Sequence, residues 1–314
     1  MRKLLIATGV VSLLSTATVA ETIGYAMSEF NDNWLTIMRN AAVEWAEENG
    51  HDLIMEDGQS DVGRQLDQIN NFIATGVDAI VVVPIDGNAT QALTNAAMSA
   101  GIPMVYANRV PGNFDTLPDN QVVVASDETE SGTLETFNIC QQLRSQGKVD
   151  GGASAYILQG QLHHPAGIQR TKDIHDVVAM DMCNFIEIID TQVGNFVRAE
   201  AQDLMTNWLT TGDEFDAVIA NNDEMAIGAI LAMKSAGIDM DTVLVGGIDA
   251  TPDALQAMAA GDLDVTVFQN AAAQGIGSVE AAIALSRGES VTKFVRIPFE
   301  LVTPENMAEY IGAN

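Results

Sequence analysis

The sequence is poor in basic residues, with 14 lysines and arginines against 43 aspartates and glutamates in 314 residues. Proteins that bind nucleic acid need lysine and arginine to neutralise phosphates, so this balance argues against a nucleic-acid partner. Aromatic residues are also scarce at 5%, but 47% of the residues are hydrophobic. That share is enough for a full core and argues against disorder. The acidic excess is typical of a well-solvated surface.

Several motifs that mark phosphate sites or catalytic sites are missing. Neither a GxxxxGK(S/T) loop nor a GxGxxG loop occurs, which argues against a phosphate-bearing ligand. The GxSxG turn and the HExxH helix of two large hydrolase groups are absent too. His163, His164 and His175 do not have the Cys/His spacing of a zinc site. We therefore predict that the protein holds no metal and no cofactor.

Long hydrophobic runs are confined to the first twenty residues. Arg2 and Lys3 precede an apolar run from Leu4 to Leu14, and small residues lead up to Ala20. This pattern predicts a secretory signal peptide over residues 1–20, cleaved after Ala20 and too short for a membrane span. We expect the remaining chain, which has no apolar run approaching about 18 residues, to be soluble and exported.

Cysteine is rare as well, because Cys140 and Cys183 are the only two. In an oxidising compartment an even pair suggests one disulfide. The alternative is a pair of unbonded buried thiols, because sequence alone does not fix the distance between them.

Short apolar segments alternate with amphipathic ones along the chain. The runs 79–83 and 122–124 contain no polar residue, which is typical of strands buried on both faces of a parallel sheet. Strands are predicted over residues 22–27, 52–56, 78–84, 103–107 and 121–125, and again over 154–159, 185–190, 216–220, 243–247 and 264–268. Helices between them include 34–49, 62–75 and 196–209. Glycines typical of helix C-caps follow helical stretches at Gly50, Gly76, Gly101, Gly212, Gly237, Gly261 and Gly288.

The alternation predicts an α/β fold. Because the strand–helix units form two successive series, we expect two similar lobes, each built on a doubly wound parallel sheet.

One segment, 218–229, runs from an apolar strand directly into Asn221-Asn222-Asp223-Glu224 and then into a helical pattern. In open parallel sheets ligands bind beyond the carboxyl ends of the strands, so polar side chains there face a crevice. Asn222 and Asp223 also suit a helix N-cap, which would account for a single end of this kind. Polar or aromatic residues follow other predicted strands too, at Asp32, Trp34, Asn108, Arg109, His164, Arg170, Phe196, Asp249 and Gln269. Together these strand ends predict one shared polar crevice.

The residue types in this crevice fit a polyol. A hydroxyl group both donates and accepts, so it pairs with carboxylates, guanidinium groups and amides. The apolar C–H faces of a sugar or polyol pack on aromatic rings. The polar partners are Asp32, Asn108, Arg109, Arg170, Asn222, Asp249 and Gln269. Trp34 and Phe196 supply the aromatic faces.

Three segments carry a resemblance to a known family: 30–34 (Phe-Asn-Asp-Asn-Trp), 219–229 and 247–252. Over nearly all of the chain after residue 20, the sequence resembles the periplasmic sugar-binding proteins of ABC transporters, of the ribose and glucose/galactose type. The resemblance implies a periplasmic binding protein of type I, whose two lobes are joined by three hinge crossings and close on one small ligand. It also implies a periplasmic monomer whose partner is the membrane permease of an ABC importer.

The resemblance assigns lobes and site residues. It implies an N-terminal lobe of residues 21–125 plus 271–297 and a C-terminal lobe of residues 126–270 plus 298–314. The crossings are expected near residues 126–127, 269–270 and 297–298. By position, the family's hydrogen-bonding residues are matched by Asp32, Asn108, Arg170, Asn222, Asp249 and Gln269, and its stacking aromatics by Trp34 and Phe196. The same match directs His164 toward the ligand.

The sequence departs from the glucose/galactose pattern in two places. It has His164-Pro165-Ala166 where those proteins have His-Pro-Asp, and residues 148–153 lack the regularly spaced oxygens of their calcium loop. The carboxylate missing at Ala166 disfavours an aldohexose. Residues 203–209 and 267–272 resemble the branch that binds inositol and related cyclic polyols, including rhizopine-like amino-inositols. The predicted ligand is therefore a cyclic polyol, with myo-inositol first.

Other functions remain open at this point. A pentose or an aldohexose would use the same residue types, and a chemotaxis or sensor ligand carrier would use the same fold. An enzyme could use Asp32 and Asp249 as a glycosidase pair, but a polyol crevice needs those carboxylates in any case. Repressors of this fold begin with a DNA-binding helix-turn-helix, whereas this chain begins with a predicted signal peptide.

Overall fold

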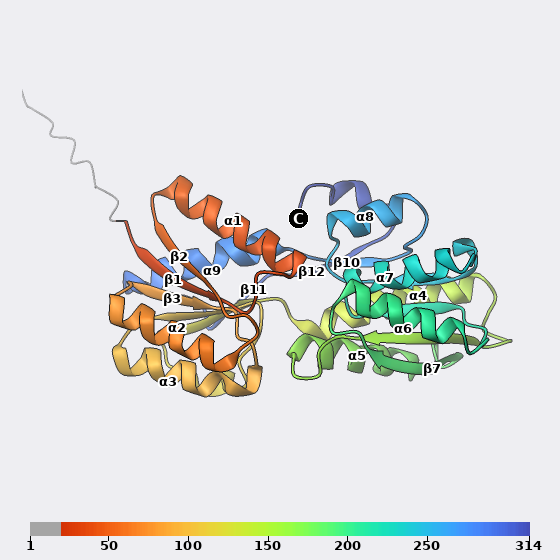
Figure 1. Cartoon of the computed structure of the whole chain (residues 1–314), viewed down its shortest axis with the longest axis horizontal. Coiled ribbons are helices and arrows are strands. Elements are labelled where there is room, and N and C mark those ends of the chain that lie inside the picture. Colours follow the sequence, from red (N-terminus) through yellow and green to blue (C-terminus); the bar gives the residue numbers. More distant parts are fainter. Residues whose placement is uncertain (1–19) are drawn as a thin grey trace, which may run out of the picture.

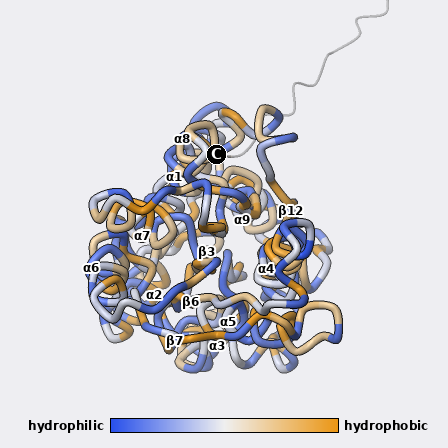
Figure 2. The backbone as a smooth tube through the Cα atoms, turned by 90° about the vertical axis from the view of Figure 1, so that its right-hand side faces the viewer, coloured by the Kyte–Doolittle hydropathy of each residue, from blue (hydrophilic) through white to orange (hydrophobic). Residues whose placement is uncertain are grey.

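The computed structural model of the protein describes residues 20–314, and the predicted signal peptide lies outside them except for Ala20. The described chain forms two α/β lobes that lie side by side (Figure 1). Seen along the long axis, β3 and β6 lie near the middle and helices such as α4, α6 and α7 surround them (Figure 2). No helix in this part of the chain is long and apolar enough to cross a membrane.

The N-terminal lobe is built on a six-stranded sheet with the strand order β11-β5-β4-β3-β1-β2, in which all neighbours are parallel. Its strands are β1 (Thr22–Met27), β2 (Asp52–Asp57), β3 (Ala79–Val82), β4 (Met104–Ala107), β5 (Gln121–Ala125) and β11 (Phe294–Arg296). One face packs on α1 (Asn33–Asn49) and α9 (Ala271–Ser286), and the other on α2 (Val62–Thr75) and α3 (Thr90–Ala100). Burial on both faces accounts for the lack of polar alternation in the central strands.

The C-terminal lobe is built on a four-stranded parallel sheet with the order β7-β6-β8-β9. These strands are β6 (Ala153–Gln159), β7 (Ile186–Val193), β8 (Ala217–Ala220) and β9 (Leu244–Gly246). Beside them β10 (Thr266–Gln269) pairs with β12 (Phe299–Val302) in antiparallel fashion. The helices are α4 (Glu128–Ser145), α5 (Pro165–Val178), α6 (Arg198–Leu209), α7 (Asp223–Ser235) and α8 (Pro252–Ala259).

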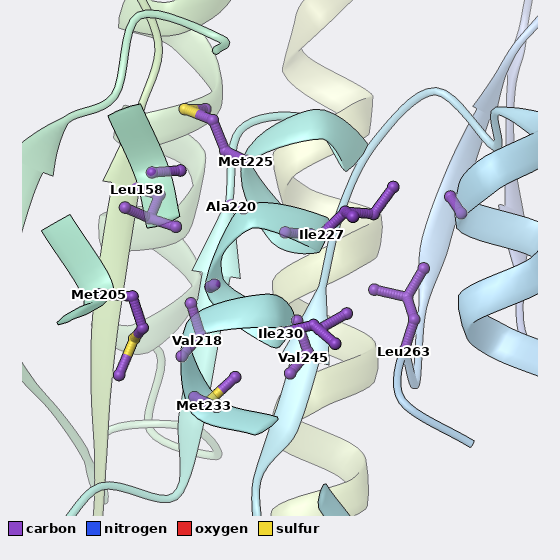
Figure 3. Close-up of a cluster of buried hydrophobic side chains, with 14 of the residues drawn as sticks. Leu158, Met205, Val218, Ala220, Met225, Ile227, Ile230, Met233, Val245 and Leu263 are labelled. Atoms are coloured by element: carbon purple, nitrogen blue, oxygen red, sulfur yellow. The ribbon is translucent and has the colours of Figure 1, made fainter. Parts of the chain in front are cut away.

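A large core fixes one face of this second sheet. Met205 of α6 and Met225, Ile230 and Met233 of α7 pack on strand residues such as Val218 (Figure 3). The other face packs on α4 and α5. These two cores hold the sheet rigidly, so the loops at the carboxyl ends of its strands are positioned from both sides.

The chain passes between the two sheets three times. It leaves the first sheet after β5 and enters α4, it returns after β10 into α9, and it crosses again between β11 and β12. The carboxyl ends of the strands in both lobes therefore face the region between the lobes (Figure 1).

The α/β fold with two parallel sheets is confirmed, but some predicted elements differ. β7 continues to Val193 instead of ending at residue 190, and α6 begins at Arg198 instead of Phe196. Phe196 adopts a left-handed backbone with φ 64°, which a helix does not allow. The prediction also missed β11 and β12, so the second lobe is not purely parallel. The seven glycines predicted after helices all have positive φ, between 71° and 79°.

Cys140 on α4 and Cys183 in the turn before β7 form a disulfide, with their Cα atoms 5.7 Å apart. Both residues are fully buried in the core between α4, α5 and the sheet. The bond ties α4 to the segment that leads into the edge strand of the sheet.

Candidate ligand-binding site

A cavity of about 440 Å³ lies between the lobes, where the strand ends meet. All ten residues predicted to contact a ligand line this cavity: Asp32, Trp34, Asn108, Arg109, His164, Arg170, Phe196, Asn222, Asp249 and Gln269. The first four come from the N-terminal lobe and the other six from the C-terminal lobe. The structure thus brings together residues that are up to 237 positions apart in sequence, although their contact with a ligand remains a prediction.

The start of α1 forms one wall. Asp32 caps this helix, because its Oδ1 accepts from the N–H of Leu35 at 2.7 Å. The indole of Trp34 is 6% exposed, and its Nε1 donates to the carbonyl oxygen of Gln269 at 2.8 Å. This bond joins the first lobe to the end of β10. Burial raises the pKa of Asp32, because the buried carboxylate has lost contact with water. A ligand group that donates a hydrogen bond to Asp32 would therefore stabilise the charged carboxylate.

The loop after β4 forms a second part of the wall. Asn108 has a left-handed backbone with φ 64°, and its Nδ2 donates to Gln274 on α9. Arg109 is buried and donates to the carbonyl oxygen of Pro84 at 2.9 Å. Burial lowers the pKa of Arg109 to about 10, which still leaves the guanidinium charged at neutral pH. Both side chains are therefore fixed before any ligand arrives.

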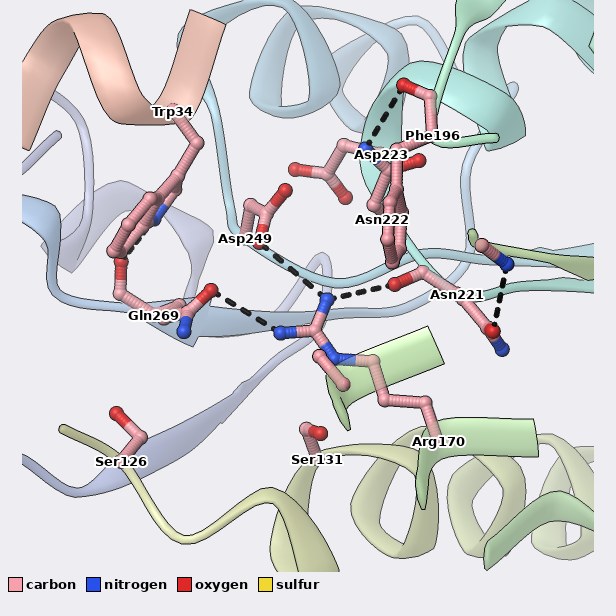
Figure 4. A network of polar contacts seen from close by, with 12 residues as sticks. Trp34, Ser126, Ser131, Arg170, Phe196, Asn221, Asn222, Asp223, Asp249 and Gln269 are labelled. Carbon is pink, nitrogen blue, oxygen red and sulfur yellow. Dashed lines mark hydrogen bonds and ion pairs between the residues drawn. The ribbon is translucent and has the colours of Figure 1, made fainter. Parts of the chain in front are cut away.

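Arg170 on α5 is the centre of the polar network in the second lobe (Figure 4). Its Nε donates to Glu128 at 2.9 Å, and its two terminal nitrogens donate to the carbonyl oxygen of Asn221 at 2.8 Å and to Oε1 of Gln269 at 3.2 Å. Asp249 lies 3.9 Å from the same guanidinium. Burial raises the pKa of Asp249 well above its ordinary value, although Arg170 opposes this shift. The network presents a fixed rim of donors and acceptors.

Asn222 carries out both roles that its place in the sequence suggested. Its Oδ1 caps α7 by accepting from the N–H of Met225 at 3.0 Å, and the same side chain lines the cavity. Its Nδ2 donates to the carbonyl oxygen of Phe196 (Figure 4). Asp223, by contrast, is fully buried and accepts from Thr251 and Thr266, so it braces the strand ends without lining the cavity.

The aromatic ring of Phe196 is held by a close neighbour. A Cβ atom on Gly160 would lie only 2.0 Å from Cζ of Phe196, so only glycine leaves room for this ring. The imidazole of His164 packs edge-on against Phe196 with ring centres 5.1 Å apart. Its Nδ1 accepts from the N–H of Ala166 at 3.0 Å, and burial keeps the pKa of His164 well below its usual range. His164 is therefore neutral, whereas His163 is exposed and lies outside the cavity lining.

The sequence prediction missed four charged residues of the cavity: Glu29, Glu128, Arg198 and Glu224. Glu128 orients Arg170, while Arg198 donates to Glu224 at 2.8 Å and to Asp253 at 2.7 Å. Glu224 also accepts from Nδ2 of Asn33 at 2.7 Å, a direct contact between the lobes. Glu224 belongs to the polar run after β8, so its place at a strand end was a usable signal. Arg198 follows no such run.

The fold and the cavity define a two-lobed solute-binding protein with a site for a small polar ligand. Residues 23–290 match the family described as periplasmic binding protein domain. The chain therefore belongs to this family, and the predicted resemblance to the sugar-binding proteins of ABC transporters is confirmed.

Several relatives are similar over most or all of their length. A protein of Rhizobium meliloti described as a candidate rhizopine-binding protein is 54% identical, with 100% of both chains covered. A ribose import binding protein of Bacillus subtilis is 30% identical, covering 90% of this chain and 87% of its own. A solved ABC transporter solute binding protein from Bacillus halodurans C-125 holds myo-inositol. It is 39% identical with a TM-score of 0.85, and the match covers 96% of this chain and 100% of that one.

Proposed function

We propose that this protein captures a cyclic polyol, with myo-inositol first, and delivers it to the membrane permease of an ABC importer. Residues 1–20 act as its signal peptide, and the chain works as a monomer in the periplasm. It performs no chemistry of its own and needs no cofactor. The similarity to the candidate rhizopine-binding protein and to the protein solved with myo-inositol supports this choice of ligand class.

The arrangement of the cavity carries the proposal. An inositol ring has a hydroxyl group on every carbon and no ring oxygen, so it needs polar partners around its whole edge. Carboxylates at Asp32 and Asp249, the amide of Asn222 and the guanidinium of Arg170 come from opposite walls and supply such a rim. The two ring faces need only apolar contact, which Trp34 and Phe196 offer.

The fixed network also implies steep selection between stereoisomers. A hydroxyl group with the wrong orientation would leave one buried polar group unpaired, which costs about 1–3 kcal/mol. Two such errors weaken binding by roughly a hundredfold, because each factor of ten corresponds to about 1.4 kcal/mol. We expect the preferred ligand to stand clearly apart from its isomers.

Calorimetric titration of the purified chain 21–314 tests the proposal. The panel is myo-inositol, an amino-inositol, glucose, galactose and ribose, and we expect tight binding of a cyclitol. Asp249→Ala should abolish this binding, because it removes a carboxylate that lines the cavity. Asp203→Ala is the matched control, because Asp203 is exposed on α6.

Two outcomes would contradict the proposal at different levels. Tight binding of ribose or glucose with no heat from any cyclitol would overturn the ligand and favour the sugar-binding alternative, for which the ribose-binding relative is a precedent. Equal binding by wild type and Asp249→Ala would mean that the cavity is not the binding site.

A further inference from the structure

The side chain of Asn314 joins three segments that meet beside the ligand cavity. Its Nδ2 donates to the carbonyl oxygen of Asp249 at 2.8 Å and to that of Gln269 at 3.0 Å. Its Oδ1 accepts from the N–H of Ala271 at 3.0 Å. One carboxamide thereby connects the loop after β9, the end of β10 and the first residue of α9.

This contact set requires a carboxamide. The group combines two N–H donors with one acceptor oxygen in a plane, and the three backbone partners use all of these functions. Because two partners are acceptors and one is a donor, the orientation of the amide is fixed. An aspartate of the same shape would have only acceptors, and its charge would face two carbonyl oxygens.

The segments that Asn314 holds are those that place ligand-contacting groups. Asp249 has a φ of 127°, a conformation that residues with a side chain rarely adopt and keep only when their surroundings fix it. Its N–H donates to Val267 at 2.8 Å, and Asn314 holds its carbonyl group. The carbonyl oxygen of Gln269 also accepts from Nε1 of Trp34, so this one oxygen meets both lobes and Asn314.

The segment that carries Asn314 is anchored on the C-terminal lobe. Met307, Tyr310 and Ala313 pack against its core, and the ring of Tyr310 lies 5.1 Å from that of Phe268. Figure 1 places the end of the described chain between the lobes. Ala271, in contrast, opens α9, which packs in the N-terminal lobe. Asn314 therefore bridges the crossing at residues 269–271.

We propose that Asn314 is a positioning residue for ligand binding. It keeps the Asp249 carboxylate and the Trp34 ring at the separation that the ligand needs, although it does not itself line the cavity. This inference rests on the proposed function, because it assumes that the cavity holds the ligand.

The test compares Asn314→Asp and Asn314→Ala with Asn207→Asp, which makes the same charge change at an exposed position on α6. For Asn314→Asp we expect the Kd for myo-inositol to rise about tenfold, equivalent to about 1.4 kcal/mol. We also expect the preference for myo-inositol over other inositol isomers to become smaller. The melting temperature of the ligand-free protein should stay within a few degrees of that of Asn207→Asp. Asn314→Ala should weaken binding less, since it adds no repulsion.

The outcomes separate positioning from stability. If both Asn314 variants melt earlier but bind myo-inositol with unchanged Kd and unchanged isomer preference, Asn314 is only structural and the inference is overturned. If Asn314→Asp does not fold, Asn314→Ala decides by the same two measurements. Failure of the wild type to bind any polyol would refute the proposed function, whereas binding by wild type with unaffected variants would refute only the role of Asn314.

Discussion

At the scale of single residues, unusual backbone conformations gather at the cavity. Among residues 20–314, seven non-glycine residues have positive φ, and four of them line the cavity: Asn108, Asn195, Phe196 and Asp249. Such conformations cost about 1–3 kcal/mol each and persist where packing and hydrogen bonds enforce them. These conformations therefore lower the stability of the fold, but they direct the side chains toward the space between the lobes.

Gly160 offers a direct test of this presentation. A methyl group at position 160 would overlap the ring of Phe196, so Gly160→Ala must displace that ring from the cavity. We expect the Kd for myo-inositol to rise about tenfold, as for the loss of one good contact of about 1.4 kcal/mol. Calorimetric titration measures this Kd. Gly151→Ala, where an added Cβ meets open space, is the control and should bind like wild type.

Asp173 on α5 leads to a prediction about pH. Burial raises the pKa of this carboxyl to about 6, so the folded chain holds the proton more tightly than the unfolded chain does. By linkage, the stability contributed by Asp173 is present at low pH and is lost as pH rises through about 6. Asp173→Asn should therefore raise the melting temperature at pH 8 and change it less at pH 4.5.

Asp173→Asn keeps the Oδ1 atom that accepts a hydrogen bond from Gln169. Asp203→Asn, at an exposed position on α6, is the control for this series of melting curves. A gain in melting temperature of equal size at both pH values would contradict the assignment of the effect to titration of Asp173.

The sequence predicted many of the residues that line the cavity, because a strand end fixes where the next residue lies. Asn108 follows β4 and Asn222 follows β8, so the rule for parallel sheets was enough to place them. Arg198 escaped this rule, since it opens a helix after an irregular turn. The positive φ of Phe196 could not be predicted either, because it depends on packing against Gly160, 36 positions earlier in the chain.

At the scale of elements, the pattern of hydrophobic residues predicted most strands but missed two short ones, β11 and β12. β3 and β5 are buried at every position, as short apolar runs between turn residues predict for strands inside a sheet. β11 and β12 are three and four residues long and flank Pro298, so neither has enough length to show a period. Their pairing is decided by distant partners, β5 and β10.

The disulfide is a covalent link between two elements, and its removal tests how much this link stabilises the fold. Cys140 and Cys183 are 43 positions apart and hold α4 against the segment before β7. We expect the double variant Cys140→Ala/Cys183→Ala to lose about 2–4 kcal/mol of unfolding free energy in urea. Neither residue lines the cavity, so the Kd for myo-inositol should stay unchanged. Two free thiols in the denatured, unreduced wild type would show that the bond does not form in the cell.

At the scale of the whole molecule, the site is divided between lobes that only a ligand can bridge fully. Asn33 and Glu224, which both line the cavity, make a direct contact between the lobes, while Asp32 and Asp249 line the cavity from different lobes. A ligand that contacts both walls stabilises the closed arrangement by its differential affinity. We expect small-angle scattering to give a smaller radius of gyration with saturating myo-inositol. Asp249→Ala should show no such change, and an unchanged radius for ligand-bound wild type would contradict closure.

The three crossings between the sheets also set the order in which this chain can fold. One face of the N-terminal sheet is covered by α9, and its edge is completed by β11 at residues 294–296. The C-terminal lobe is complete only when β12 has paired with β10. Domains normally fold as units while the chain emerges, but here neither lobe has all its parts until the final segment is available. A chain moving across a membrane from its N-terminus would therefore complete neither lobe until almost all of it has passed.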